Sequence, residues 1–199
     1  MTRSIKLLGS GGNRSARCVW TVQELGVEVT QVDTADVFNE PARHSVHPQG
    51  KIPAAIIDDE YFFESSAICL HLCDLYPKQA LSAAPGSTAR AEITKWISFA
   101  QSEIEAYLWH SFLIRRAGGD LDSQAIHEFN NHIAKAGLGV LADHLTNNDY
   151  LCGTAFSVAD IVVGWTVNWS SKQSLLANDS SLVGYLDRLH ARECCALVR

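Results

Sequence analysis

The sequence predicts a two-domain protein in which an α/β domain precedes an all-helical domain. Three observations indicate this. Strand and helix patterns alternate in the first third of the chain, a segment rich in Ser, Ala, Pro and Gly follows, and strand patterns are absent after it. The 199 residues suffice for two small domains, and a hydrophobic content of 47% supplies a core for each. We expect domains at 1–78 and 89–199, joined by a linker at 79–88.

The first domain is expected to have the element order β-α-β-α-β-β-α. Ser4–Leu8 is a short apolar strand, and the helix Ser15–Leu25 follows a glycine-rich turn and ends before Gly26. Four further segments of this domain show, in chain order, the alternation of a strand, a weak helical pattern, a hairpin with an acidic turn, and a helix that ends before a proline. They are Val27–Asp33, Ala35–Gly50, Pro53–Phe63 and Ser65–Leu75.

The second domain shows only helical periodicity. Its expected helical segments are Ala89–Arg116, Asp122–Leu145, Val158–Ser171, and one or two helices within Leu182–Leu197. Gly137 and Gly139 weaken the second of these patterns. Ser157 and Asp160 form a variant of the capping box that begins a helix, and we interpret them as structural.

Charge and composition exclude several classes of function. Sixteen basic and 22 acidic residues give a net charge of −6, which argues against nucleic acid as the main partner. The chain has no apolar run of about 18 residues, so we expect neither a membrane span nor membrane binding, and the first residues lack the apolar core of a signal peptide. Six cysteines without a C-x-x-C pair are typical of buried thiols in a reducing compartment, most simply the cytoplasm.

Nucleotide and metal sites are also disfavoured. Gly9 and Gly11 fit a dinucleotide-binding turn, but Arg14 stands where its third glycine belongs. The pairs His44 and His47, and His127 and His132, have no further ligand residues at metal spacing, so we expect no metal.

Two helix starts remain as candidate sites. The turn before Ser15 brings backbone N–H groups to a helix N-terminus, which favours an anion such as a thiolate, although a plain strand-to-helix turn explains it as well. At the second start, Ser65 or Ser66 is expected to cap the helix, with Glu64 matching the helix dipole.

Four segments together resemble the cytosolic glutathione S-transferase family, in the right order and over nearly the whole chain. They are Arg17–Gly26 (the first helix), Pro48–Ala54 (around a cis proline), Phe63–Ile68 (an acid–serine pair) and Leu151–Ile161 (the helical-domain staple). The resemblance assigns no class within the family. It implies a thioredoxin-like domain that binds glutathione as cosubstrate, and a helical-bundle domain that supplies the pocket for a small hydrophobic electrophile. It also implies a cytoplasmic homodimer with a role in detoxification.

The resemblance further assigns the glutathione contacts. A cis Ile52–Pro53 bond would present the Ile52 backbone to the cysteinyl part of the tripeptide, as an added strand would. Glu64 and Ser65 would bind the γ-glutamyl amine and carboxylate, and Lys51 the glycyl carboxylate. From the second subunit, Gln101 or Glu105 is expected to reach the γ-glutamyl amine.

The sequence departs from the family where the thiolate is held. Family members place Tyr, Ser or Cys at a position that falls here on Gly12 or Asn13. The donors that remain are the Asn13 amide first, then the Ser15 hydroxyl or N–H, then the Ser10 hydroxyl. Lowering a thiol pKa of ~8.5 by two units requires about 2.7 kcal/mol. One hydrogen bond to the thiolate, worth ~1.5–3 kcal/mol, together with a helix dipole is enough.

Two other functions stay open. A glutathione-dependent reductase needs a cysteine where the strand meets the helix, and residues 13–16 offer none. A non-catalytic glutathione-binding or dimerisation scaffold is favoured by the missing hydroxyl or thiol. It is disfavoured by the joint presence of the residues assigned to the tripeptide, which a pure scaffold does not need. The sequence does not identify the electrophile.

Overall fold

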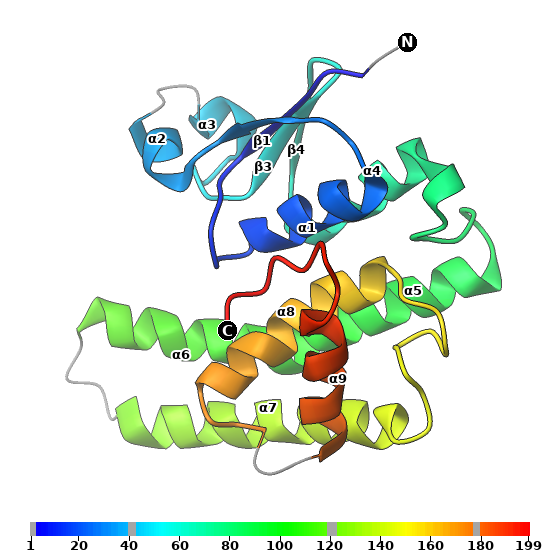
Figure 1. Ribbon diagram of the computed structural model, residues 1–199. Helices are drawn as coiled ribbons and strands as arrows, with labels where there is room; N and C mark the ends of the chain where they lie inside the picture. The colour runs from blue at the N-terminus through cyan, green and yellow to red at the C-terminus, as the bar shows by residue number, and fades with distance from the viewer. Residues whose placement is uncertain (1–2, 40–42, 119–122, 177–179) are drawn as a thin grey trace. The chain divides into compact units, whose positions relative to one another are not determined.

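The computed structural model describes residues 3–39, 43–118, 123–176 and 180–199 (Figure 1). The chain forms two compact units. The first contains the residues up to Arg90 together with the C-terminal segment Arg192–Arg199, and the second is Ala91–Ala191. The C-terminal segment, which the expected boundaries group with the helical domain, therefore belongs to the first unit.

The first unit contains a four-stranded sheet of strand order β2-β1-β3-β4. In chain order its elements are β1 (Ile5–Leu8), α1 (Ser15–Leu25), β2 (Thr30–Val32), α2 (Thr34–Asn39), α3 (Arg43–Val46), β3 (Ala54–Ile57), β4 (Glu60–Phe63), α4 (Ser65–Leu75) and a 3₁₀ turn (Pro77–Gln79). β1 and β2 are parallel because α1 connects them, whereas the other strand pairs are antiparallel. This is the thioredoxin-like arrangement that the sequence predicts, so the fold class is confirmed.

Alternating side chains give the sheet two buried faces. Leu8 and Ala54 pack with Val37 of α2 and Val46 of α3 in one cluster. Leu7, which alternates with Leu8, is buried on the opposite face, where α1 and α4 lie together (Figure 1). Helices therefore cover both faces of the sheet, and the loops that follow its strands lie at the ends of the strands.

Two elements of the first unit differ from the prediction. Only Thr30–Val32 of the expected strand Val27–Asp33 pairs with β1, because β2 is an edge strand with a single neighbour. The region 35–50 contains α2 and α3 rather than one irregular helix. The acidic hairpin turn is confirmed: Asp58 and Asp59 both have positive φ, as a two-residue turn requires, and Arg3 forms an ion pair with Asp58.

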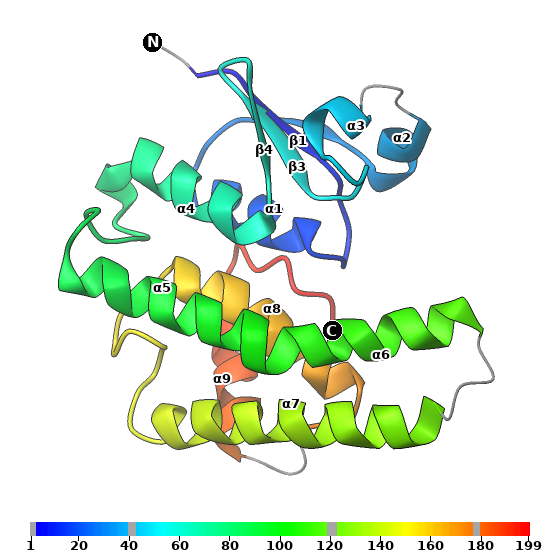
Figure 2. The same cartoon turned by 180° about the vertical axis from the view of Figure 1, so that it is seen from behind.

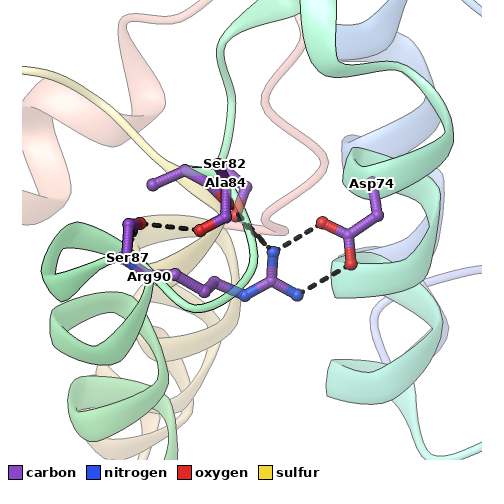
Figure 3. Close-up of polar contacts among 6 residues, drawn as sticks. Asp74, Ser82, Ala84, Ser87 and Arg90 are labelled. Carbon is purple, nitrogen blue, oxygen red and sulfur yellow. Dashed lines mark hydrogen bonds and ion pairs between the residues drawn. The ribbon is translucent and has the colours of Figure 1, made fainter.

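The segment between α4 and the next helix is tied to the first unit (Figure 3). The Arg90 guanidinium donates to both carboxylate oxygens of Asp74, at 2.5 and 2.9 Å, and also to the Ser82 hydroxyl at 3.2 Å. The Ser87 hydroxyl accepts the Arg90 N–H at 3.2 Å and donates to the Ala84 carbonyl at 2.7 Å. Ser87 is thus the N-cap of the following helix, and the expected linker is an ordered segment.

Within its described residues, the second unit contains helices and no β-strand (Figure 2). They are α5 (Thr88–Ala100), a π-helical segment (Gln101–Glu105), α6 (Ala106–Ala117), α7 (Ser123–Leu145), α8 (Val158–Lys172) and α9 (Ser180–His190). α5 continues through the π-helical segment into α6, as the single pattern Ala89–Arg116 predicts. α9 ends at His190, well before Leu197. In the described parts of the chain, no helix combines the length and apolarity needed to cross a bilayer.

Gly137 does not interrupt α7, because it accommodates the π-helical segment. A Cβ at this position would lie 2.7 Å from the Ile104 side chain and 3.0 Å from the Glu103 carbonyl oxygen. No real side chain tolerates such distances, so the glycine permits the close approach of the two helices. The glycine that weakens the helical pattern therefore has a packing function.

The start of α8 confirms the predicted capping box. Asp160, which is fully buried, accepts the Ser157 N–H at 2.9 Å and the Ser157 hydroxyl at 3.0 Å with one oxygen. Its other oxygen accepts the Leu151 N–H at 2.9 Å and the Tyr185 hydroxyl at 3.0 Å. Burial raises the pKa of Asp160, and these hydrogen bonds oppose the rise. Every polar group in this cluster has a partner, as a structural role requires.

Candidate functional site

The register of the sheet brings four chain segments to one edge. Leu8 lies opposite Ala54 and opposite Val32, and Ala54 lies opposite Phe63. The residues that follow or precede these strand ends must therefore emerge together. They are Gly9-Ser10, Asp33-Thr34, Ile52-Pro53 and Glu64-Ser65. The Ile52–Pro53 bond is cis, as the resemblance implies.

Gly9 lets the Ser15 and Ile52 side chains approach the backbone just after β1. It has a φ of 109°, and a Cβ there would lie 2.4 Å from the Ser15 Oγ and 3.0 Å from the Ile52 Cβ. Ser15 is 1% exposed, and among the described residues its hydroxyl has no hydrogen-bond partner. A buried hydroxyl without a partner is costly in a folded protein. This oxygen lies beside Gly9 and Ile52, at the edge where the four segments meet.

Asn13 uses its amide within the turn. Its Nδ2 donates to the Ser10 carbonyl at 2.7 Å and to the Thr34 hydroxyl at 3.4 Å. Its Oδ1 accepts the Ser15 N–H at 2.8 Å, so that N–H is occupied as well. All three expected donor residues are therefore linked by hydrogen bonds that shape the turn before α1.

Thr34, which sequence reasoning missed, holds the same turn from α2. Its hydroxyl donates to the Ser10 carbonyl at 2.8 Å and accepts the Ser10 N–H at 2.9 Å. Its own N–H donates to the Ser10 hydroxyl at 3.2 Å. No local pattern marks Thr34, because the contact joins residues 24 positions apart and exists only once β2 pairs with β1.

The start of α4 corrects the expected cap. Glu64, not Ser65 or Ser66, is the N-cap residue, and its side chain makes no capping hydrogen bond. Glu64 has a φ of 69°, an unusual value for a residue other than glycine. Strained backbone of this kind is concentrated at functional sites.

Arg17 forms a buried hydrogen bond to Ser65, a contact that the sequence pattern did not predict. Its guanidinium is fully buried, and Nη1 donates to the Ser65 hydroxyl at 3.1 Å. Ser65 is 3% exposed. A charged residue inside the buried stripe of α1 is the signal that could have identified Arg17, because such groups are rarely buried without a specific partner.

Charged side chains gather on the same edge around His47. Its Nδ1 accepts the Gln49 N–H at 3.0 Å, and its ring lies 5.2 Å from that of Phe63. Burial lowers the pKa of His47, the nearby Lys51 contributes in the same direction, and the Glu64 carboxylate opposes both. Lys51 and Glu64 are both exposed, and each lies close enough to His47 to influence its charge.

Cysteine and metal chemistry find no support at this edge. Cys18 is buried within α1 and contacts the Ser65 carbonyl at 3.9 Å. Contact with the Cys69 thiol, together with burial, raises the pKa of Cys18, which disfavours a reactive thiolate. In the part of the chain that the structure describes, no three His, Cys, Asp or Glu side chains are grouped to hold a metal ion.

Comparisons with known proteins agree with this architecture. Residues 10–80 match the family model for the glutathione S-transferase N-terminal domain. The chain is 30% identical over 146 residues to Glutathione S-transferase 3 of Zea mays, which covers 68% of this chain and 63% of the maize protein. It is 36% identical over 142 residues to Elongation factor 1-gamma of Carassius auratus, which covers 68% of this chain and 29% of that protein. The alignments thus span less than two thirds of either relative.

A solved structure extends the match to both units. A sphingomonad glutathione S-transferase complexed with glutathione has a TM-score of 0.84 and 26% identity, over 96% of each chain. The family-model match covers the first unit, and the structural match covers nearly all of the chain. The protein therefore belongs to the glutathione S-transferase family.

Proposed function

We propose that this protein binds glutathione at the edge of the sheet and activates its thiol for attack on a small hydrophobic electrophile. The observation that carries the proposal is the unpartnered Ser15 hydroxyl, buried beside Ile52 where the turn before α1 and the start of α4 converge. The relatives named transferase, and the family member whose structure contains glutathione, support the same activity.

Each part of the tripeptide has a partner of suitable chemistry. The Ile52 N–H and C=O pair with the cysteinyl backbone, as an added strand would. Ser65, held by Arg17 at the N-terminus of α4, binds the γ-glutamyl carboxylate, and the Glu64 carboxylate binds the amine. Lys51 pairs with the glycyl carboxylate.

The Ser15 hydroxyl is the donor that we assign to the thiolate. A hydrogen bond to a charged acceptor is worth ~1.5–3 kcal/mol, which lowers a thiol pKa of ~8.5 by about one to two units. Asn13 positions Ser15 through the bond from the Ser15 N–H, and Ser10 stays a secondary candidate. The thiol loses its proton to solvent. The thiolate then bonds to the electrophilic carbon as a leaving group, such as a halide, departs with the electron pair of its own bond to that carbon.

Two measurements test this function on the whole chain. Titration calorimetry with glutathione is expected to show binding, and the ultraviolet absorbance of the bound thiolate is expected to titrate below the value for free glutathione. Ser15→Ala is expected to retain binding and to return the thiol pKa toward that of free glutathione. Absence of binding at millimolar glutathione would overturn the proposal, and an unchanged thiol pKa in Ser15→Ala would remove Ser15 from this role.

A non-catalytic glutathione-binding protein is the second candidate. Gly12 and Asn13, the two candidates for the position where the family places a hydroxyl or thiol, offer neither group, and relatives named elongation factor 1-gamma align over most of this chain. Glutathione binding without turnover of any model electrophile, and with an unperturbed thiol pKa, would favour this function over the first.

The oligomeric state is part of the proposal. We infer a homodimer with twofold symmetry, the commonest arrangement of soluble oligomers, located in the cytoplasm. Glu105 does not serve as the expected contact across subunits, because it is buried in the helical unit and accepts the Thr166 hydroxyl at 2.8 Å. Light scattering that gives the mass of a single chain would contradict the dimer.

A further inference from the structure

The C-terminal segment Arg192–Arg199 is fastened to α1 at its beginning. The Arg192 Nε and Nη2 donate to the two carboxylate oxygens of Glu24, both at 2.7 Å, and the Trp20 Nε1 donates to Glu24 at 2.9 Å. Burial works against ionisation of Glu24, but these hydrogen bonds outweigh it and lower its pKa. The two-point ion pair is therefore present at neutral pH.

The segment then runs along α1 toward the turn that precedes this helix (Figure 1). Near its end the Leu197 side chain is buried, at 8% exposure, whereas the next side chain, Val198, is 51% exposed. A Cβ on Gly12 would lie 3.1 Å from the Val198 Cγ2. A methyl group of Val198 thus stands directly beside the backbone of residue 12.

Gly12 belongs to the turn that faces the sulfur under the proposed function. Because residue 12 has no side chain, the half-exposed apolar side chain of Val198 lies directly against the backbone of this turn. A substituent bonded to the sulfur extends away from this turn and must pass the side chains that lie next to it. An apolar group that contacts Val198 is removed from water, which is favourable by a fixed amount per methylene.

We propose that Val198 is a specificity-determining residue that forms an apolar wall beside the glutathione sulfur and favours electrophiles with a hydrocarbon substituent. The Arg192–Glu24 ion pair is the anchor that positions this wall. The proposal rests on glutathione binding at the turn before α1, and it concerns what is attached to the sulfur rather than the activation of the sulfur.

Binding of S-alkyl glutathiones tests the proposal without requiring turnover. Titration calorimetry gives the Kd for S-methylglutathione and S-hexylglutathione, and their ratio measures the contribution of the longer chain. We expect Val198→Ala to reduce this preference for the hexyl compound by about fourfold, the effect of one lost methylene contact. Arg192→Met is expected to reduce it similarly, because the segment loses its anchor. The matched control is Val183→Ala, a valine on α9 that is 44% exposed and expected to keep the wild-type ratio.

The outcomes separate the two proposals. If the wild type binds both compounds and Val198→Ala and Arg192→Met keep the wild-type ratio within twofold, Val198 forms no such wall, while glutathione binding stands. If the wild type binds neither compound nor glutathione, the proposed function fails and the wall fails with it. A reduced ratio in both variants, with S-methylglutathione affinity and circular dichroism unchanged, supports the proposal.

Discussion

The helices α8 and α1 each begin beside a buried serine, but the protein satisfies only one of the two hydroxyls. Ser157 bonds to Asp160, which has four donors in all. Ser15 is equally buried, and its hydroxyl has no partner in the described structure. A polar cluster that is complete within the fold serves stability, whereas the buried Ser15 hydroxyl without a partner is the group that we assign to a ligand.

Asp160→Ala disrupts the complete polar cluster at the start of α8, and we expect it to have the largest effect of all the variants. It leaves the donors of Ser157, Leu151 and Tyr185 without their acceptor inside the helical unit. We expect the free energy of unfolding to fall by about 3–5 kcal/mol. Urea denaturation measures this loss. Asp143→Ala, an exposed aspartate of α7, is the control and should change stability by less than about 0.5 kcal/mol.

Ser15→Ala, compared with Ser170→Ala, sharpens the contrast. Ser170 is fully buried and donates to the Thr166 carbonyl at 2.9 Å. Ser15→Ala is expected to lower turnover of an aryl halide about 10–100-fold with little change in stability, because no protein hydrogen bond is lost. Ser170→Ala is expected to show the reverse, a loss of about 1 kcal/mol in stability and full turnover.

Steady-state kinetics and urea denaturation of the two serine variants show whether Ser15 acts in turnover or only in stability. Equal losses of stability with equal turnover would show that Ser15 is merely a buried residue. Asn13→Ala provides a further check, since it removes the acceptor of the Ser15 N–H. It should lower turnover at least tenfold, with retention on immobilised glutathione largely intact.

Arg17→Lys tests whether the buried guanidinium positions Ser65. We expect glutathione affinity to fall about tenfold while the thiol pKa of bound glutathione is unchanged, since α4 binds the γ-glutamyl end. If Arg17 acts through Ser65, the double variant with Ser65→Ala binds no more weakly than the weaker single variant. Additive losses in calorimetry would show that the two residues act independently.

His47 gives the smallest expected effect, a pH dependence of stability. Its pKa is lowered in the folded protein, so below about pH 6.5 the unfolded chain binds the proton first. The free energy of unfolding should therefore decrease as the pH falls through that value. His47→Gln should show a shallower decrease, and parallel pH profiles of the two proteins would contradict this assignment.

Local signals predicted the elements but not their partners. α1, α4 and the hairpin follow from periodicity, glycine and proline, which act within a few residues. The donors at the turn before α1 could be named from the sequence, but their ranking could not. Whether Asn13 or Ser15 retains a free donor depends on Thr34, which reaches the turn only through strand pairing.

Longer-range features were inaccessible for the same reason. The C-terminal segment was expected to be helical, but it forms an ion pair between Arg192 and Glu24, two residues that lie 168 positions apart in the chain. Arg17 was assigned to the first helix, but its bond to Ser65 requires α1 and α4 to share one face of the sheet. A sequence can indicate such a residue only where a charged side chain falls at a position that the hydrophobic pattern predicts to be buried.

The contact between Gly12 and Val198 constrains how the site could change during evolution. Residue 12 is one of the two positions at which the resemblance places the family's donor, but the Cβ of a serine or tyrosine there would crowd the Val198 methyl at 3.1 Å. A smaller residue at 198 would relieve this contact, but it would also remove the apolar wall that we propose there. The side chain that residue 12 can carry is therefore coupled to the size of residue 198.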